Sequence, residues 1–376
     1  MTKQKKPRLV SLFSGCGGMD LGFHQAGYDI IWANDIDPDA CETYRENIGD
    51  IIEGDVTNLP VPELKGIDVL TSGFPCQPFS NAGSRKGVTD PRGRLYENTM
   101  EFVEKLQPRA VVFENVRGLL STKVDGDKLI DVLEEKLQAL GYQVSHRLLN
   151  FSHFGVPQKR IRVVVIGIRN TNQFEHAYPV ITTGKDLTIG TTLAGLTNDH
   201  PNQTELMKLN PQALYYGAMI PPGGSWKSLP YDILPDRWKN IRDNMKRYHY
   251  PNFFRRCASH EISGTITAAF KPENAGVWHP VESRILSVRE IARIQSFPDD
   301  FVFKGRTVKS KYQQIGNAVA PRMAYCIADQ LKRLLFENDT LSARMLPESS
   351  ELNVNQPVTN QKPDLMAKMQ FLDAAE

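Results

Sequence analysis

The sequence predicts an α/β protein built on a doubly wound, mostly parallel sheet of the Rossmann-like type, with a second, smaller and irregular domain. Three observations lead to this prediction. From residue 8 to about 168, short β-rich runs alternate with helical patterns, which is typical of βαβ units. Between about 175 and 285 the alternation stops, and clusters of Pro, Gly and aromatic residues replace it. Beyond 285 helical patterns return.

The predicted strands and helices follow one another in the order that such a sheet needs. The strands are RLVSLF (8–13), IIWAND (30–35), GIDVLTSGF (66–74), RAVVFEN (109–115) and RVVVIGI (162–168). The helices are RLYENTMEFVEKL (94–106), DKLIDVLEEKLQAL (127–140), SVREIARIQSF (287–297) and RMAYCIADQLKRLLF (322–336). Apolar residues recur at helical spacing in the last helix, which predicts that one of its faces packs on the first domain.

These patterns divide the chain into segments. We expect a large domain over residues 1–175 that the returning chain 311–338 completes, a second domain over 176–285 and a hinge segment over 286–310. The tail, 339–376, is rich in Asn, Gln, Pro, Ser and charge and poor in aromatics, which predicts disorder.

Composition excludes few functions by itself. The chain has 376 residues, a hydrophobic content of 40% and a formal net charge of +2. Such a chain can bury a sizeable core in two or three domains. The net charge is too small to identify a polyanion-binding protein, so a nucleic-acid function must rest on local patches.

The cysteines and the first residues indicate the compartment. The five cysteines are odd in number and widely spaced, and none forms a CxxC pair, so neither a disulfide framework nor a zinc knuckle is indicated. The start, MTKQKKPRLVSLF, leads into a strand rather than a signal-peptide core, and no apolar run approaches membrane-spanning length. We therefore expect a cytoplasmic protein without metal and without membrane contact.

A nucleotide-shaped pocket is predicted at the ends of the first strands. The first strand runs into the glycine-rich turn FSGCGG (13–18), where a ligand can approach the backbone without meeting a Cβ. Asp35 follows Asn34 at the second strand end and can accept from the hydroxyls of an adenosine ribose, and Asp55 in EGDV can accept from an adenine amino group. These features fit NAD and S-adenosylmethionine alike. The turn lacks the full GxGxxG spacing, which favours a ligand without phosphates.

A thiol and an acid are expected on adjacent strand ends. GIDVLTSGF is followed by PCQP (75–78), which places Cys76 at the carboxyl edge, where open α/β sheets bind ligands. Cysteines are more often buried and structural, but flanking prolines and a polar loop favour exposure here. RAVVFEN ends in Glu114 and Asn115, so a carboxylate is expected beside the thiol.

Two arginines come before a further strand. QKRIR places Arg160 just ahead of RVVVIGI and Arg162 at its start, and strand alternation predicts that both side chains share one face. Two arginines alone are more often part of a solvated surface. Their position next to the thiol and the acid gives them a possible chemical role.

Together these residue types suit methylation of cytosine. Carbon 5 of the base is too weak a nucleophile to attack a sulfonium methyl unaided, so a nucleophile must first add at carbon 6 and form an enamine. A thiolate suits this addition because it is strongly nucleophilic and can later be expelled. Charge builds on N3 and O2 during the addition, so an acid at N3 and an arginine at O2 lower the barrier.

With these motifs in order, the chain resembles the C5-cytosine DNA methyltransferases. The resemblance covers about 8–170 and 285–335. It is carried by FSGCGG, the pair Asn34 and Asp35, GFPCQPFS, ENV, QKRIR, SVREIARIQSFPD and YQQIGNAV. An ordered set of this kind is far more specific than any one of its members.

The resemblance implies roles for individual residues. Cys76 attacks carbon 6, Glu114 contacts N3 and the amino group, and Arg162 contacts O2, with Arg160 in support. The cofactor is S-adenosylmethionine, and Ile36 stands where many relatives place an aromatic against the adenine. The implied cofactor-binding positions are Phe13, Ser14, Gly15, Cys16, Gly18, Asp35, Ile36, Asp55, Val56, Pro75, Leu95, Asn317 and Val319.

The resemblance also assigns DNA contact to two segments. The loop FSNAGSRKGVTDPRGR (79–94) suits a lid over an extruded base, and 176–285 matches the family's target-recognition domain. Basic and aromatic residues mix there, which suits phosphate contact and base readout, unless the aromatics form a small core. The basic residues are Arg237, Lys239, Arg242, Lys246, Arg247, Arg255 and Arg256, and the aromatics are Trp238, Tyr248, Tyr250, Phe253 and Phe254.

Three other functions stay open. A tRNA cytosine-5 methyltransferase of the same family shares PCQ and ENV, but the chain has no CFT tripeptide and its middle region is long. An NAD-dependent oxidoreductase would leave PCQ and ENV unexplained. A silent DNA-binding protein would not need Cys76, Glu114 and Arg162 together.

The expected partner is double-stranded DNA, in which a flipped-out cytosine of one specific sequence is methylated. The compact chain with one recognition region resembles the modification enzyme of a bacterial or phage restriction-modification system. A cognate restriction endonuclease acting on the same site is then a possible partner. We expect a monomer in solution.

Overall fold

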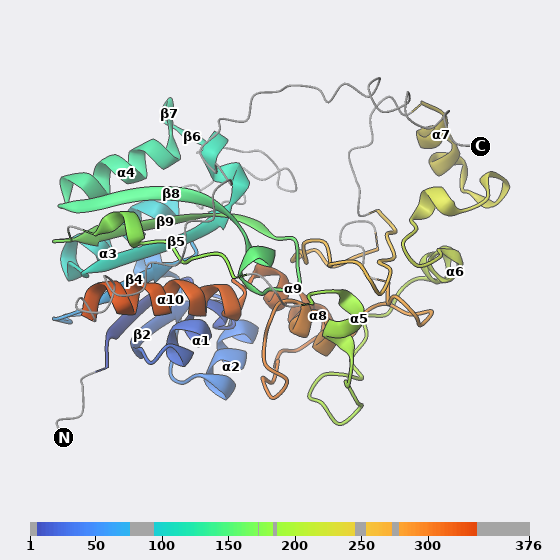
Figure 1. Cartoon of the computed structure of the whole chain (residues 1–376), viewed down its shortest axis with the longest axis horizontal. Helices are drawn as coiled ribbons and strands as arrows, with labels where there is room; N and C mark the ends of the chain where they lie inside the picture. Colours follow the sequence, from blue (N-terminus) through green and yellow to red (C-terminus); the bar gives the residue numbers. More distant parts are fainter. Residues whose placement is uncertain are drawn as a thin grey trace, which may run out of the picture. The chain divides into compact units, whose positions relative to one another are not determined.

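The described part of the chain builds a seven-stranded sheet of strand order β3-β2-β1-β4-β5-β9-β8 (Figure 1). The structure is a computed structural model that describes residues 6–75, 94–171, 173–182, 186–244, 253–272 and 278–336. The strands are β1 (Arg8–Leu12), β2 (Asp29–Asp35), β3 (Ile52–Glu53), β4 (Val69–Ser72), β5 (Ala110–Val116), β8 (Tyr142–Asn150) and β9 (Ile161–Arg169). A two-stranded hairpin joins β6 (Lys123–Val124) and β7 (Asp127–Lys128).

The strand directions confirm the predicted doubly wound, mostly parallel sheet. Neighbours from β3 to β5 are parallel, whereas β9 runs antiparallel to both β5 and β8. Because β9 is reversed, its first residues meet the carboxyl ends of β4 and β5. The sequence prediction did not include β8, whose apolar and polar residues alternate poorly, with the burial pattern BeiiieeBi.

Helices cover both faces of the sheet. The helices of the described residues are α1 (Gly18–Gln25), α2 (Pro38–Asn47), α3 (Leu95–Leu106), α4 (Leu129–Ala139), α5 (Ile189–Leu193), α6 (Pro211–Met219), α7 (Asp236–Asn244), α8 (Val288–Ile294), α9 (Val308–Asn317) and α10 (Pro321–Phe336), of which α5, α6 and α7 belong to the middle region. One core cluster joins α3 and α4 to the sheet through side chains such as Phe102 and Leu133, which pack with Val111 and Val165.

The end of the chain returns to the first helix. Helix α10 buries a stripe at helical spacing that includes Met323, Ile327 and Leu331. It lies beside α1 (Figure 1), where a Cβ at Gly22 would come within 2.5 Å of the Cβ of Ala324. The approach is too close for any residue but glycine, which explains Gly22 in the middle of a helix.

The middle region has short elements and its own apolar cluster. Ala213, Tyr216, Ile220, Trp226, Leu229, Leu234 and Phe254 form this cluster, with Trp238 and Phe253 packed against it. The predicted aromatic core is therefore present. All described residues belong to one compact unit, Met1–Phe336, and the predicted division at 175, 285 and 310 stays a prediction.

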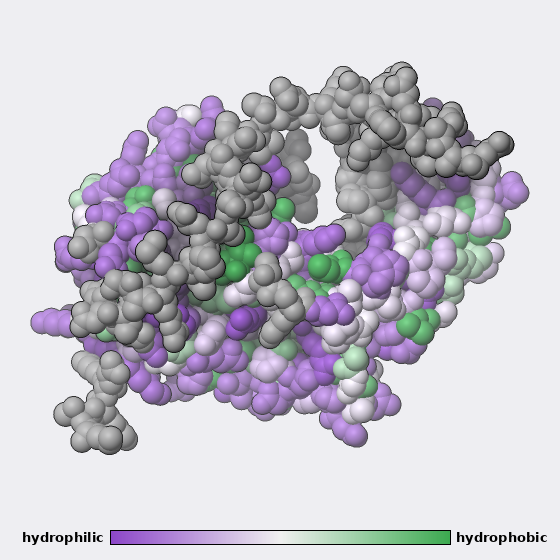
Figure 2. Space-filling view, viewed as in Figure 1, coloured by the Kyte–Doolittle hydropathy of each residue, from purple (hydrophilic) through white to green (hydrophobic). Residues whose placement is uncertain are grey.

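The surface seen in Figure 2 is mainly hydrophilic, and apolar side chains show as small separate patches. Among the residues that the structure describes, no helix combines the length and apolar character that crossing a membrane requires.

Candidate active site at the carboxyl edge of the sheet

The glycine-rich turn after β1 is held by the end of β2. The backbone N–H of Ser14 donates to the carbonyl of Asn34 at 2.9 Å, and that of Gly15 donates to Oδ2 of Asp35 at 2.7 Å. Oδ1 of Asp35 accepts from the N–H of Asp37 at 2.9 Å. Burial raises the pKa of Asp35, and these two donors oppose the rise. Each carboxylate oxygen keeps a second lone pair for a ligand hydroxyl.

Asn34 brings the next strand end alongside Asp35. Its buried side-chain amide donates to the carbonyls of Ile52 and Gly54 at 3.0 and 2.9 Å. The N–H of Gly54 donates back to the carbonyl of Asp35 at 2.9 Å. Asp55 follows Gly54 directly in the chain. The two predicted adenosine acceptors, Asp35 and Asp55, therefore lie at neighbouring strand ends that hydrogen bonds hold together.

The turn presents an open face beside these acids. Ile36 is 63% exposed, although it is a large apolar side chain. A Cβ built on Gly15 meets no atom within 4 Å, and Phe13 has a positive φ of 55°, which bends the chain there. Asp55 uses Oδ1 to accept from the N–H of Thr57 at 3.0 Å, which leaves its other oxygen for a ligand. Exposed apolar surface next to acceptors suits a purine and a ribose.

The other predicted cofactor positions differ in burial. Val56 is buried, whereas Pro75 and Leu95 are half-buried at the end of β4 and the start of α3. Asn317 is exposed at the end of α9. A Cβ on Gly18 would overlap the carbonyl oxygen of Val319, so YQQIGNAV packs directly on the glycine-rich turn.

A buried acid beneath the turn was missed by the sequence reasoning. Asp20 is fully buried and accepts from the hydroxyls of Ser11 and Tyr44, each at 2.7 Å. Ser14 Oγ in turn lies 2.8 Å from Ser11 Oγ. Burial raises the pKa of Asp20 to about 6, and the hydroxyl donors oppose the rise. Its place two residues after FSGCGG was the signal that could have found it.

The predicted acid and arginine form an ion pair at the sheet edge. Glu114 on β5 is opposite Val164, and Arg162 on β9 is opposite Val116, so the two side chains are diagonal neighbours. Nε of Arg162 lies 3.1 Å from Oε1 of Glu114, and both side chains are nearly buried. Burial lowers the pKa of Arg162, and the Glu114 carboxylate opposes this.

The strand that leads to the predicted nucleophile is tied to the same edge. Nδ2 of Asn115 donates to the carbonyl of Phe74 at 2.9 Å, and the ring of Phe74 packs edge-on against Phe113 at 6.1 Å. Pro75 is the last described residue of this stretch. Cys76 and all but the last residue of the expected lid lie outside the described residues.

Arg160 has a different environment from Arg162. It is 2% exposed, and its guanidinium donates to the carbonyls of Ile266, Gly316 and Ala318 at 2.9, 3.2 and 3.1 Å. Burial lowers its pKa, the positive charge of Arg162 adds to this, and Glu114 opposes it. The geometry fits the supporting role implied by the resemblance, since Arg160 joins β9 to two distant segments.

Two buried glutamines complete this junction and were not predicted. Nε2 of Gln158 donates to Oε1 of Gln295, and Oε1 of Gln158 accepts from the N–H of Ile266 at 2.8 Å. Gln295 then donates to the carbonyl of Ala318 at 2.7 Å. QKRIR, RIQSF and GNAV therefore meet in one polar cluster. Both glutamines lie within motifs that the sequence analysis quoted, but the motifs alone do not show that the two side chains meet.

The basic residues of the middle region do not all face solvent. Arg256 is 4% exposed and donates to the carbonyls of His279 and Ile220 at 2.8 and 2.9 Å, and to that of Glu282. Arg255 pairs with Glu261 at 2.5 Å. The suggestion that these two arginines suit DNA contact is not supported, because their donors are used within the protein. Lys246, Arg247, Tyr248 and Tyr250 lie outside the described residues.

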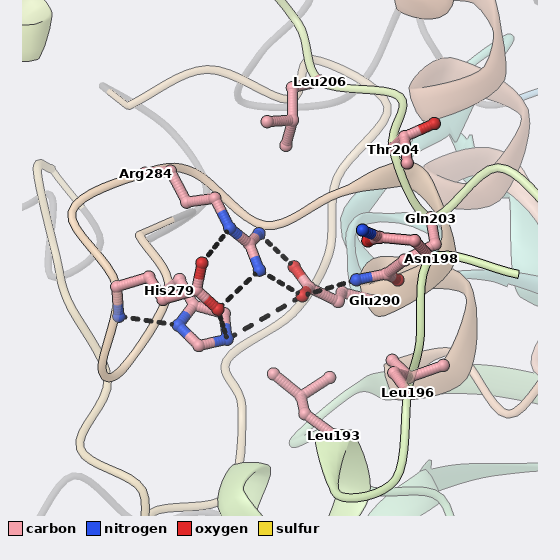
Figure 3. A pocket seen from close by; sticks show the side chains of 10 residues that line it. Leu193, Leu196, Asn198, Gln203, Thr204, Leu206, His279, Arg284 and Glu290 are labelled. Carbon is pink, nitrogen blue, oxygen red and sulfur yellow. Dashed lines mark hydrogen bonds and ion pairs between the residues drawn. The ribbon is translucent and has the colours of Figure 1, made fainter. Parts of the chain in front are cut away.

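A cavity of about 420 Å³ that lies away from the sheet edge is lined by an ionic cluster (Figure 3). Nη2 and Nη1 of Arg284 donate to Oε1 and Oε2 of Glu290 at 2.7 and 2.8 Å, and the N–H of Ser287 donates to Oε2 at 2.7 Å. His279 lies 3.8 Å from Glu290, and burial lowers its pKa. These charges satisfy one another, so the cluster needs no ligand.

No group of His, Cys, Asp and Glu within the described ranges has an arrangement that could hold a metal ion.

The comparisons with known proteins agree with this geometry. A family model described as C-5 cytosine-specific DNA methylase matches residues 8–333. The chain belongs to this family. As a C-5 cytosine-specific DNA methylase it is an enzyme that transfers a methyl group to carbon 5 of cytosine in DNA, as its motifs predicted, and the tRNA and oxidoreductase readings are disfavoured.

Relatives extend over most of this methylase. It is 37% identical over 350 residues to the Type II methyltransferase M.NgoFVII of Neisseria gonorrhoeae, covering 90% of this chain and 89% of that protein. It is 34% identical to the Type II methyltransferase M.Eco47II of Escherichia coli, covering 87% and 79%. A solved DNA modification methyltransferase from an E. coli prophage has the same fold, with 23% identity, a TM-score of 0.62 and coverage of 88% and 99%.

Proposed function

We propose that this methylase transfers the methyl group of S-adenosylmethionine to a flipped-out cytosine in one specific double-stranded DNA sequence, with Cys76 as covalent nucleophile. We propose further that it is the modification enzyme of a Type II restriction-modification system. The names of its relatives support the role in a restriction-modification system. The ion pair between Glu114 and Arg162 supports methyl transfer through Cys76. The pair lies at the end of β5, which neighbours β4, the strand that leads to Cys76.

The other cysteines support Cys76 by their surroundings. Cys16, Cys41 and Cys257 are buried, and burial raises the pKa of each of these thiols. Burial also raises the pKa of Cys326, on α10. A raised pKa keeps a thiol protonated at neutral pH and therefore a poor nucleophile. Cys76 is the remaining cysteine of the sequence and follows β4 at the ligand-binding edge.

Glu114 and Arg162 fit the charge that develops on the base. As the thiolate bonds to carbon 6, negative charge grows on N3 and O2, and carbon 5 becomes nucleophilic. Glu114 contacts N3, and the Arg162 guanidinium stabilises O2. After methylation, carbon 5 loses its proton and the sulfur–carbon 6 bond breaks, which releases the thiolate. Oε1 of Glu114 is buried and faces Nε of Arg162 at 3.1 Å, so the ion pair holds the carboxyl group at the edge where the base is to bind.

The open face near Asp35 fits S-adenosylmethionine. When bound, this cofactor supplies an electrophilic methyl on a sulfonium. The acceptor oxygens of Asp35 and Asp55 suit the ribose hydroxyls and the adenine amino group, and exposed Ile36 suits the face of the purine. Gly15 allows close approach, because even a Cβ there would meet nothing within 4 Å.

Sequencing of bisulfite-treated DNA tests the proposal directly. A host expressing the chain should carry 5-methylcytosine at one position of one short sequence, and DNA from a host expressing Cys76→Ser should carry none there. DNA with this modification should resist a nuclease that cuts the same sequence. Methylation absent from DNA but present in tRNA would overturn the proposed substrate.

A further inference from the structure

A second cavity, of about 310 Å³, lies between the start of α6, the segment 268–272 and α9. Its rim is basic and its floor is apolar. The lining residues are Met207, Lys208, Leu209, Asn210, Ala213, Ala268, Ala269, Phe270, Lys271, Pro272, Lys309 and Tyr312.

The three rim lysines, Lys208, Lys271 and Lys309, carry uncompensated charge. All three are exposed, and none forms an ion pair or hydrogen bond with any residue that the structure describes. Lys311, only two residues beyond Lys309, contrasts with them because it pairs with Glu205 at 2.8 Å. The lining residues that the structure describes include no acid, so their summed formal charge is +3. A concave site of one sign concentrates counter-ions of the other.

Helix α6 adds to this field at the same rim. Pro211 is its first residue, and Oδ1 of Asn210 caps it by accepting from the N–H of Ala213 at 2.7 Å. The positive end of the helix dipole therefore points to the side where Lys208 and Asn210 line the cavity. The dipole strengthens the attraction that the lysines provide.

The floor fixes the spacing of two of the lysines. The rings of Phe270 and Tyr312 stack with centroids 4.4 Å apart and an interplanar angle of 9°. Both rings are buried, and Tyr312 donates to the carbonyl of Leu286 at 2.7 Å. Lys271 follows Phe270 in the chain, and Lys309 lies one helical turn before Tyr312. The stack therefore holds their backbones at a set separation.

Both walls of the cavity lead to the active edge. The carbonyl of Ile266 binds Arg160, and five residues further along the chain is Lys271. Helix α9 runs from near Lys309 to Asn317 in the implied cofactor pocket, a rise of about 12 Å for eight residues. The cavity thus shares the segment 266–271 with the carbonyl that binds Arg160, and it shares α9 with the implied cofactor pocket.

We propose that the cavity binds a backbone phosphate of the DNA duplex that is being methylated. Lysine ammonium groups are mobile point charges that suit a phosphate and carry little base discrimination. The contact would hold the duplex in register while the bases are read elsewhere. The inference rests on DNA as the substrate and is independent of the role proposed for Cys76.

The test measures DNA affinity against salt concentration for Lys208→Gln, Lys271→Gln, Lys309→Gln and the triple variant. Loss of one phosphate contact should reduce the slope of log K against log salt by about 0.9 in the triple variant, with smaller steps in the single variants. Affinity should fall equally for cognate and unrelated duplexes. Methylation at saturating DNA should persist, which separates this test from that of the proposed function.

Lys136→Gln is the matched control, because Lys136 is an exposed lysine on α4 that has no ion-pair partner among the described residues. It should leave the slope unchanged. Thermal unfolding should show that all variants remain folded. A triple variant with the slope and affinity of the control would overturn the proposal. So would a cavity that binds inorganic phosphate in the wild type, loses it in the triple variant, and leaves DNA binding unaffected.

Discussion

The carboxyl edge of the sheet and the middle region use their charged residues in different ways. At the edge, strand register alone places Glu114 beside Arg162, and their charged groups face each other at the surface of the sheet. In the middle region, Arg256 is buried and its guanidinium donates to backbone carbonyls, those of His279, Ile220, Val281 and Glu282. Trp238 likewise packs in the aromatic cluster.

The difference arises because a regular sheet and an irregular region place different demands on their side chains. A sheet satisfies its own backbone, so side chains at its edge are free for chemistry. An irregular region must use side chains to satisfy backbone carbonyls and to build a core. The basic and aromatic residues of the middle region therefore serve stability as well as DNA binding. Four experiments test this difference between the two regions.

The largest effect is expected at the edge, for Glu114→Gln. If Glu114 acts as an acid at N3, the methyl-transfer rate should fall by about a hundredfold to ten-thousandfold, with a much smaller change in DNA affinity. Single-turnover kinetics and equilibrium binding measure the two quantities. Glu101→Gln, on the surface of α3, is the control and should match the wild type. Equal losses of rate and binding would make Glu114 merely structural.

A second experiment uses the buried acid under the cofactor turn. The pKa of Asp20 is about 6 in the fold against an ordinary value of 3.8, so its contribution to stability is complete below about pH 3.8 and is lost as pH rises through 6. The difference in unfolding free energy between wild type and Asp20→Asn should therefore shift against the wild type by up to about 3 kcal/mol from pH 4 to pH 7. Urea unfolding at several pH values measures it. A difference that is independent of pH would refute this assignment.

The third experiment tests the middle region with Arg256→Met. Removal of the guanidinium leaves buried carbonyls unpaired, which should cost about 1–3 kcal/mol of stability. The salt dependence of DNA binding should not change. Arg237→Met, at an exposed position on α7, should leave stability within about 0.5 kcal/mol of the wild type. Unaltered stability together with a reduced salt slope in the Arg256 variant would show that Arg256 contacts DNA after all.

The smallest effect is expected for Asp35→Ala. Loss of the proposed ribose contact should raise the Michaelis constant for S-adenosylmethionine about tenfold, equal to about 1.4 kcal/mol, with a smaller change in turnover. Steady-state kinetics at saturating DNA gives both values. An unchanged Michaelis constant would argue against the contact.

The sequence predicted those parts of the site that depend on local order along the chain. Asp35 and Glu114 follow recognisable strands, and a parallel sheet brings such strand ends to one edge. The junction of Gln158 with Gln295 could not be found in this way, because its residues are 137 positions apart and meet only in the folded chain. Nothing in the local pattern marks either glutamine as buried.

The same reasoning explains the other omissions. The rim lysines of the second cavity come from three separate segments, so no local pattern groups them. Arg256 was grouped with DNA-contacting residues because charge alone does not reveal whether a side chain faces solvent or buried carbonyls. Residues whose role depends on long-range packing require the fold itself.

The central claim is that this methylase works through a covalent bond from Cys76, and trapping that bond tests it most directly. Duplex DNA with 5-fluorocytosine at the methylated position should yield an adduct that survives denaturation. Fluorine replaces the hydrogen that carbon 5 must lose before the thiolate can leave, so the covalent bond persists. Peptide mapping should place the adduct on Cys76. Cys76→Ser should form none, while Cys257→Ser should still form it. An enzyme that turns over normal DNA yet yields no adduct, or an adduct on another residue, would contradict the account.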